Sequence, residues 1–189
     1  MSSQTPEVKG PAVMGGRNWL DARFGPGHFL KLAREQEPNV PERILPGEWY
    51  PARPLLHALQ HSVAQLDEFD GLESFVEVLA GESARQDLRG IHRAFLWVAS
   101  PRMFLRAAPT IWANYANFGV VGESENEPGR FVVRIGEIPR DYVEWLAGAW
   151  KGFLPTAIEL AGGKNPRATV LDRKPGGAGW EIRYQLTYE

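Results

Sequence analysis

The sequence predicts an α+β fold in which N-terminal helices pack on a small antiparallel sheet, with a long helix between two β-hairpins. Residues 142–163 form one long apolar stretch with many small residues, which indicates a buried helix. Residues 180–188 alternate between apolar and polar side chains, as a strand with one buried face does. The order helices, hairpin, helix, hairpin is typical of a single α+β domain. The apolar face of the alternating run consists of Trp180, Ile182, Tyr184, Leu186 and Tyr188.

Residues 1–16 are polar and rich in glycine and proline, so we expect a disordered arm there and a single ligand-binding-type domain over residues 17–189. A short helix containing Phe29, Leu30 and Leu32 should follow the arm. The prolines of residues 37–51 exclude a continuous helix and predict an extended connector. This connector ends in an aromatic pair, Trp49 and Tyr50.

Four helices are predicted between residues 54 and 117. The first covers residues 54–66, where leucines recur at helical spacing, and the second covers residues 72–79 after a break at residues 67–71. The third covers residues 84–99, with Ser83 as its N-cap after Gly81. The fourth covers residues 101–117, with Ser100 at the cap, and Pro109 should kink or split it.

Two hairpins are predicted around the long helix. Residues 119–124 and 130–135 have the alternation of strands and flank a turn-prone segment at residues 125–129. The long helix starts after Pro139 and ends at Gly162 and Gly163, with a kink at Pro155. Residues 168–171 and 178–189 then form the second hairpin, around a turn at residues 175–178.

Charge and composition exclude several classes of function. The 189 residues carry a formal net charge of −2 and no cysteine. This charge gives no general attraction to nucleic acid, and the lack of cysteine excludes disulfides, thiolate metal sites and a cysteine nucleophile. The N-terminus lacks the apolar core of a signal peptide, and no apolar run reaches the roughly 20 residues that span a bilayer. We expect a cytoplasmic protein with no nucleic-acid partner and no membrane span.

Motifs for catalysis or metal binding are absent from the sequence. His57 and His61 stand four residues apart, a spacing that suits a metal, but they lie opposite the leucine stripe, which favours two surface histidines. His92 lies near the inner stripe of its helix; it is either a core histidine or a polar contact to a ligand, haem included. Neither a serine nucleophile motif nor a glycine-rich phosphate loop is present. We therefore assign no catalytic residue and no metal ligand.

Aromatic residues on the predicted helices are the strongest candidates for a binding site. Seven tryptophans are present, and two of them, Trp145 and Trp150, share the long helix with two glycines four residues apart, Gly148 and Gly152. These glycines either admit a flat ligand or allow close packing against a neighbouring element. With both glycines and with His92 as a polar contact, the candidate pocket consists of Trp97, Phe104, Trp112, Tyr115, Trp145, Trp150 and Phe153. An aromatic stripe of this kind is also what a filled core requires.

Four segments carry a resemblance to known proteins: residues 44–51, 88–97, 100–104 and 149–162 before the final hairpin. Together they resemble an uncharacterised protein family of myxobacteria. More distantly, the chain is similar to 4-vinyl-reductase-type sensor domains, whose superfamily also contains haem-nitric-oxide-binding domains and TRAPP vesicle-tethering subunits. The resemblance covers roughly residues 13–189. It implies an α+β fold around an apolar pocket for haem, an aromatic effector or an acyl chain, and often a dimer.

The chain departs from this superfamily in residues that carry function. The cysteines of the sensor-type domains and the acylated cysteine of TRAPP subunits have no counterpart, since the chain has no cysteine. The Tyr-x-Ser-x-Arg motif of the haem-binding branch is also missing. Haem is therefore not firmly implied, and His92 is the only histidine in a position to ligate it.

Three functional hypotheses follow from the sequence. The first is a non-enzymatic sensory or regulatory domain that binds a small apolar or aromatic ligand internally and signals through a homodimer or a protein partner. The second is an interaction or scaffold module with a filled core, which would dock a partner through Trp19, Trp49 and Tyr50. The third is an enzyme acting on a small aromatic substrate, with His92 as its acid or base.

Overall fold

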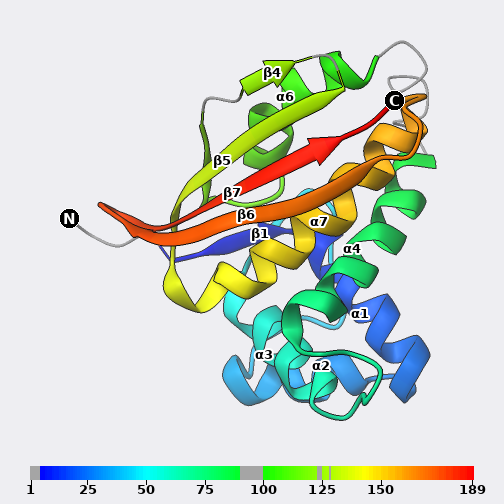
Figure 1. Ribbon diagram of the computed structural model, residues 1–189. Coiled ribbons are helices and arrows are strands. Elements are labelled where there is room, and N and C mark those ends of the chain that lie inside the picture. The colour runs from blue at the N-terminus through cyan, green and yellow to red at the C-terminus, as the bar shows by residue number, and fades with distance from the viewer. Residues whose placement is uncertain (1–4, 90–99, 123–124, 128) are drawn as a thin grey trace.

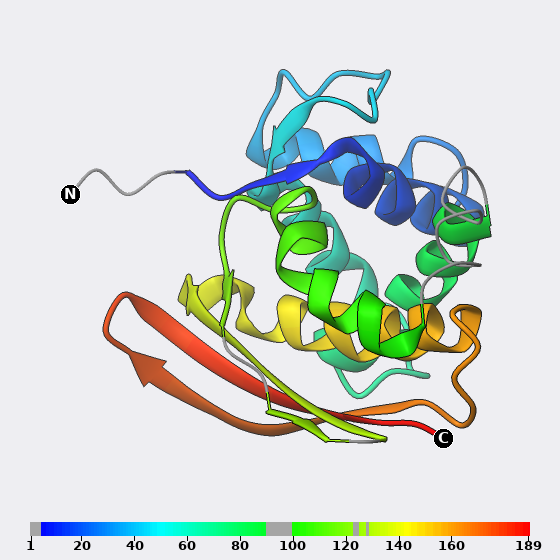
Figure 2. The same ribbon diagram turned by 90° about the horizontal axis from the view of Figure 1, so that it is seen from above.

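The computed structural model describes residues 5–89, 100–122, 125–127 and 129–189. It confirms the predicted α+β class: a curved antiparallel sheet forms one layer, and the helices lie on one side of it (Figures 1 and 2). The long helix α7 (Val143–Leu160) lies along the sheet, after a 3₁₀ turn over Arg140–Tyr142. The N-terminal helices pack on α7 and lie mostly beyond it as seen from the sheet (Figure 2).

Residues 7–16, which the sequence places in a disordered arm, instead form β1 (Glu7–Lys9) and the start of α1 (Gly10–Phe24). β1 pairs antiparallel with β2 (Trp49–Pro51), at the end of the predicted connector. Val8 is fully buried and also bridges to Ala116. Burial of apolar side chains therefore outweighs the low helix and strand propensity of the Gly- and Pro-rich start.

Among the described residues, the helical region is helical where the sequence predicts it, but several helix boundaries differ from the prediction. The next helices are α2 (His28–Gln36), α3 (Ala52–Val63), α4 (Leu72–Arg89) and α6 (Pro101–Ala113). α4 runs through Gly81 and Ser83 without a break, so the predicted cap at Ser83 is wrong. Ser100 does cap α6, because its hydroxyl accepts from Met103 N at 3.4 Å. Within the described part of the chain, no helix has the length and apolar character needed to cross a membrane.

Pro109 lies inside α6 without splitting it, so of the two predicted effects, a kink or a split, the split does not occur. α6 is also shorter than predicted, since it ends at Ala113 rather than near residue 117.

The continuity of α4 through Gly81 has a packing cause. A Cβ at Gly81 would meet Gly152 O and the Thr156 hydroxyl at 3.5 Å, so α7 covers this point of α4. The sequence pattern predicts a helix break at this glycine, but contact with a neighbouring helix keeps it in the helical conformation.

The sheet has the strand order β3-β5-β7-β6 and is antiparallel throughout. Its strands are β3 (Val120–Val121), β4 (Glu125–Glu127), β5 (Arg130–Ile138), β6 (Arg167–Gly176) and β7 (Gly179–Thr187). β4 also pairs with β5, so Glu125–Glu127 is a strand where the sequence predicts a turn. The predicted alternation in β7 is confirmed: Ile182, Tyr184 and Leu186 are fully buried, and they face α7.

α7 is held against α4 by backbone-to-backbone packing. A Cβ built on Gly148 would overlap the carbonyl of Glu73, and one on Gly152 would overlap the carbonyl of Glu77. Two glycine positions on one face of α7 therefore bring the two helix backbones into contact. On its other side α7 accepts a buried hydrogen bond from β7, in which the Tyr184 hydroxyl donates to Leu146 O at 3.0 Å.

A charged cluster closes the same contact at the surface. The Lys151 ammonium on α7 lies 3.3 Å from Glu73 and 2.6 Å from Glu77 of α4, and Arg173 of β6 also pairs with Glu73. Burial lowers the pKa of Lys151, but its bonds to the two carboxylates outweigh burial and hold that pKa above its usual value. The cluster joins α4, α7 and β6.

The glycine contact predicts opposite effects for two glycine-to-alanine substitutions. Gly152→Ala should lower the free energy of unfolding by about 1–3 kcal/mol, because its methyl group overlaps the α4 backbone. Gly81→Ala is the matched control on the other helix; it has ordinary contact distances and should be neutral or stabilising by up to about 1 kcal/mol. Urea unfolding of both variants measures these values. Equal stabilisation by the two alanines would contradict the assigned packing.

The buried Tyr184 hydroxyl predicts a stability that depends on alkaline pH. Burial raises the pKa of Tyr184 well above its usual value, whereas the unfolded chain ionises near pH 10. The unfolded state thus loses its proton first, so this contribution to stability is complete below about pH 10 and declines above it.

Unfolding free energies of the native protein and Tyr184→Phe between pH 8 and 11 test this prediction. Below about pH 10 the variant should be less stable by about 1 kcal/mol, the value of one buried hydrogen bond. Above about pH 10 the difference should shrink. A difference that grows with pH would show that Tyr184 ionises more readily in the folded state.

Candidate ligand-binding cavity

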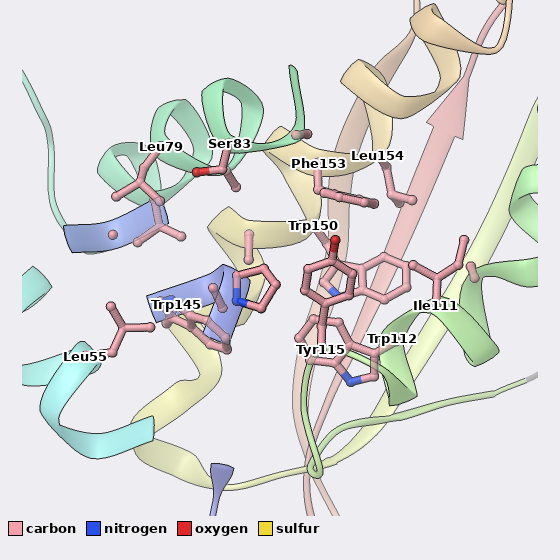
Figure 3. A pocket seen from close by; sticks show the side chains of 18 of the residues that line it. Leu55, Leu79, Ser83, Ile111, Trp112, Tyr115, Trp145, Trp150, Phe153 and Leu154 are labelled. Carbon is pink, nitrogen blue, oxygen red and sulfur yellow. The ribbon is translucent and has the colours of Figure 1, made fainter. Parts of the chain in front are cut away.

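A cavity of about 110 Å³ lies between the N-terminal helices on one side and α6 and α7 on the other (Figure 3). Its walls are aliphatic and aromatic, and no charged side chain lines it among the described residues. α7, α6 and the turn after α6 contribute Phe104, Ala108, Ile111, Trp112, Tyr115, Trp145, Ala149, Trp150, Phe153 and Leu154. The opposite wall consists of Pro11, Ala12, Gly16, Leu55, Leu59, Val76, Leu79, Ala80, Ser83 and Ala84.

Helical spacing explains which face of α7 meets the cavity. Trp145, Ala149 and Phe153 recur every fourth residue and form one stripe along the helix. The stripe with Gly148 and Gly152 lies beside it on the same helix. Because the glycine stripe is pressed on α4, the adjacent stripe is turned towards the space between α4 and α6.

Six of the aromatic residues singled out in the sequence come together here. Phe104, Trp112, Tyr115, Trp145, Trp150 and Phe153 all line the cavity. Trp112 is central, with ring centroids 6.4 Å from Trp145 and 5.6 Å from Trp150. Tyr115 packs edge-on against Phe153 at 6.1 Å. These contacts join α6, the turn after it and α7 around one apolar space.

Other residues of the predicted pocket take different places. Gly148 and Gly152 do not line the cavity; they form the contact with the α4 backbone. Trp97 and His92 lie outside the described residues. Sequence reasoning missed the opposite wall, of which Gly16, Ala80 and Ser83 are members. The small size of these residues is a signal of close approach, but the wall depends on α1, which the sequence does not predict.

Few polar atoms face the cavity. The Trp112 indole donates its N–H to Phe118 O at 2.8 Å, outside the cavity wall. Ser83 and Tyr115 contribute hydroxyl groups. The Trp150 indole nitrogen is buried and has no hydrogen-bond partner within the described part of the chain. In Figure 3 this nitrogen lies at the end of the indole that is turned towards the middle of the lining residues.

The described histidines lie among the N-terminal helices and not in the cavity. His28 Nε2 is 3.0 Å from the buried hydroxyl of Ser62. His57 Nε2 is 2.9 Å from Glu35, and this hydrogen bond lowers the pKa of the Glu35 carboxyl. The ring centroids of His61 and His57 are 3.9 Å apart, and His61 Nδ1 lies 3.0 Å from the backbone oxygen of His57.

The aromatic residues considered for partner docking differ in exposure. Trp19 packs edge-on against Phe75 at 4.9 Å and belongs to the helical core. The Tyr50 hydroxyl accepts from Leu45 N at 2.8 Å, and its ring is partly buried. Trp49 is 36% exposed, and the Lys9 ammonium lies 4.4 Å from its ring centroid. Trp49 is thus the most accessible of the three.

Comparison with known proteins identifies the fold. Neither a family model nor a curated protein matches the sequence. The Fe(II) unliganded H-NOX protein from K. algicida has a TM-score of 0.70 at 12% identity, over 96% of this chain and 97% of that chain. The Fe(II)NO form of the S. oneidensis H-NOX protein has a TM-score of 0.69 at 10% identity, over 96% of this chain and 99% of that chain. A mutant of the T. tengcongensis H-NOX protein has a TM-score of 0.67 at 9% identity, over 96% of this chain and 98% of that chain. This likeness shows the fold.

Haem is the group that this fold implies, since haem distortion is studied in the H-NOX family. The described cavity does not fit it. A volume of about 110 Å³ falls below the roughly 300–1,000 Å³ of sites for drug-sized ligands, and a porphyrin is at least that large. Of the side chains that ligate haem iron, the described lining contains only Tyr115, whose ring packs on Phe153.

The poor fit predicts that the protein stays free of haem when it is produced in cells supplied with excess haem precursor. The absorption spectrum of the purified protein should lack a Soret band, while an H-NOX protein produced in parallel should show one. A stoichiometric Soret band would contradict the prediction. Its loss in His92→Ala would then make His92 the iron ligand.

Proposed function

We propose that this chain is a non-enzymatic sensory or regulatory domain that binds one small apolar or aromatic molecule in the cavity between α4, α6 and α7. The observation that carries the proposal is an aromatic-lined cavity without charged lining residues in the described chain. A core built only for stability packs to a density that leaves few voids of this size. The likeness to H-NOX structures supports a ligand-binding role, because one of these structures is in an Fe(II)NO ligation state.

The size of the cavity limits the ligand to about one aromatic ring. An engineered apolar cavity of roughly 150 Å³ stays dry and binds benzene or xenon. The cavity here is somewhat smaller, at about 110 Å³, and its tryptophan walls suit a flat molecule. The ligand class is therefore a small aromatic or another compact apolar molecule, and not a tetrapyrrole.

The position of the cavity provides a route from binding to regulation. Its two walls belong to different layers, the N-terminal helices and the α6–α7 layer. A molecule in the cavity contacts both, so it favours the arrangement in which both walls are in place. This ligand-dependent arrangement of the two walls would change contacts within a homodimer or with another protein in the cytoplasm. The resemblance to myxobacterial proteins and to 4-vinyl-reductase-type sensor domains supports the same kind of role.

The two other hypotheses find less support. A scaffold module with a filled core does not account for the cavity, although Trp49 is exposed enough to contact a partner. An enzyme needs an acid or base at the substrate, and the described lining offers only the hydroxyls of Ser83 and Tyr115. His92, the acid or base nominated from the sequence, lies outside the described residues.

Filling the cavity should abolish binding of a small aromatic probe. Ala149 lines the cavity from α7, so Ala149→Leu places further carbon atoms in it. Benzene should raise the melting temperature of the native protein, because a ligand that binds only the folded state stabilises it. This rise should vanish in Ala149→Leu.

Ala113→Leu is the matched control, since Ala113 is exposed at the end of α6 and does not line the cavity. It should keep the full benzene-dependent rise. Differential scanning calorimetry over a benzene series measures the native protein and both variants. An equal rise in the native protein and Ala149→Leu would place benzene elsewhere and refute this site.

A further inference from the structure

The Trp150 indole N–H is the one buried donor of the described cavity lining without a partner. Its side chain is 5% exposed, so bulk solvent does not supply the missing acceptor. Buried donors in native proteins are almost always hydrogen-bonded, and an exception calls for a physical reason. The nitrogen belongs to a residue of the cavity wall, which suggests that its acceptor arrives with the ligand.

Neighbouring rings hold the Trp150 indole in place. Tyr184 stacks on it with a centroid distance of 6.0 Å and an interplanar angle of 27°, and Trp112 packs on it at 5.6 Å. The Tyr184 hydroxyl donates to Leu146 O, and the Trp112 indole donates to Phe118 O. These two neighbours are themselves fixed by hydrogen bonds. Trp150 therefore cannot easily turn to find an acceptor elsewhere.

The chemistry of the walls defines the rest of the ligand. An ionised ligand would be buried without a counter-charge, because the described lining has no charged side chain. A ligand with several polar groups would leave most of them unpaired. One acceptor atom, in contrast, completes the hydrogen bonding of Trp150. The aromatic walls favour a flat body for the rest of the molecule.

We infer that the ligand is a small, neutral aromatic molecule with one hydrogen-bond acceptor, which accepts from Trp150 Nε1. This inference rests on the proposed function and narrows its ligand class. Benzene and pyridine form a suitable pair of probes, because they have nearly the same shape and differ in one acceptor nitrogen. Only pyridine can accept from Trp150.

Titration calorimetry with both probes at pH 8, where pyridine is neutral, tests the inference. In the native protein pyridine should bind at least as tightly as benzene, although water solvates pyridine better. Trp150→Phe removes the donor and should lower the affinity for pyridine relative to that for benzene by about five-fold, the value of one net hydrogen bond. Benzene in the same variant reports any effect of the smaller ring. Trp49→Phe, the same change at an exposed site, should leave both affinities unaltered.

A second measurement covers the case in which Trp150→Phe does not fold. The indole N–H proton resonance of Trp150 in the native protein should move downfield with pyridine and little with benzene. An unchanged pyridine-to-benzene ratio in Trp150→Phe, or equal proton shifts with both probes, would overturn the inference while leaving the proposed function intact. Failure of both probes to bind would overturn the proposed function as well.

Discussion

The close contact between α7 and α4 sets the positions of the sheet, of α6 and of the cavity. Gly148 and Gly152 let the two helix backbones touch, and larger side chains at either position would overlap backbone carbonyls. Lys151 closes the contact from the surface through Glu73 and Glu77. Because this contact fixes the rotation of α7, it sends one stripe of the helix towards the sheet and another towards α6. The cavity exists where that second stripe and the N-terminal helices fail to meet.

The fold alone does not decide which molecule the chain binds. The architecture matches H-NOX structures over nearly the whole chain. Among the described residues, Trp112, Trp145 and Trp150 line a cavity of about 110 Å³. A shared fold preserves the place for a ligand, while the side chains that line it decide its size and chemistry. We propose that here they favour an aromatic molecule over a metal macrocycle.

Local patterns in the sequence predict the sheet and the α7 region well and the N-terminus poorly. Period-two alternation in β7 is sufficient because burial of one sheet face requires it. α1 and the continuity of α4 at Gly81 depend on packing between distant segments, which propensity does not contain. The same holds for the site: an aromatic stripe identifies Trp145 and Trp150 but looks alike in a core and in a cavity. Gly148 and Gly152 could not be assigned to α4 contact until both helices were placed.

A crystal structure determined under xenon pressure would test whether the cavity between α4, α6 and α7 is present. Xenon occupies apolar cavities of this size without needing any hydrogen bond, so it reports the cavity independently of ligand chemistry. We expect one ordered xenon atom among Trp145, Ala149 and Trp150. Side chains that close this space, with no xenon between α4, α6 and α7, would show a filled core and rule out the proposed binding site.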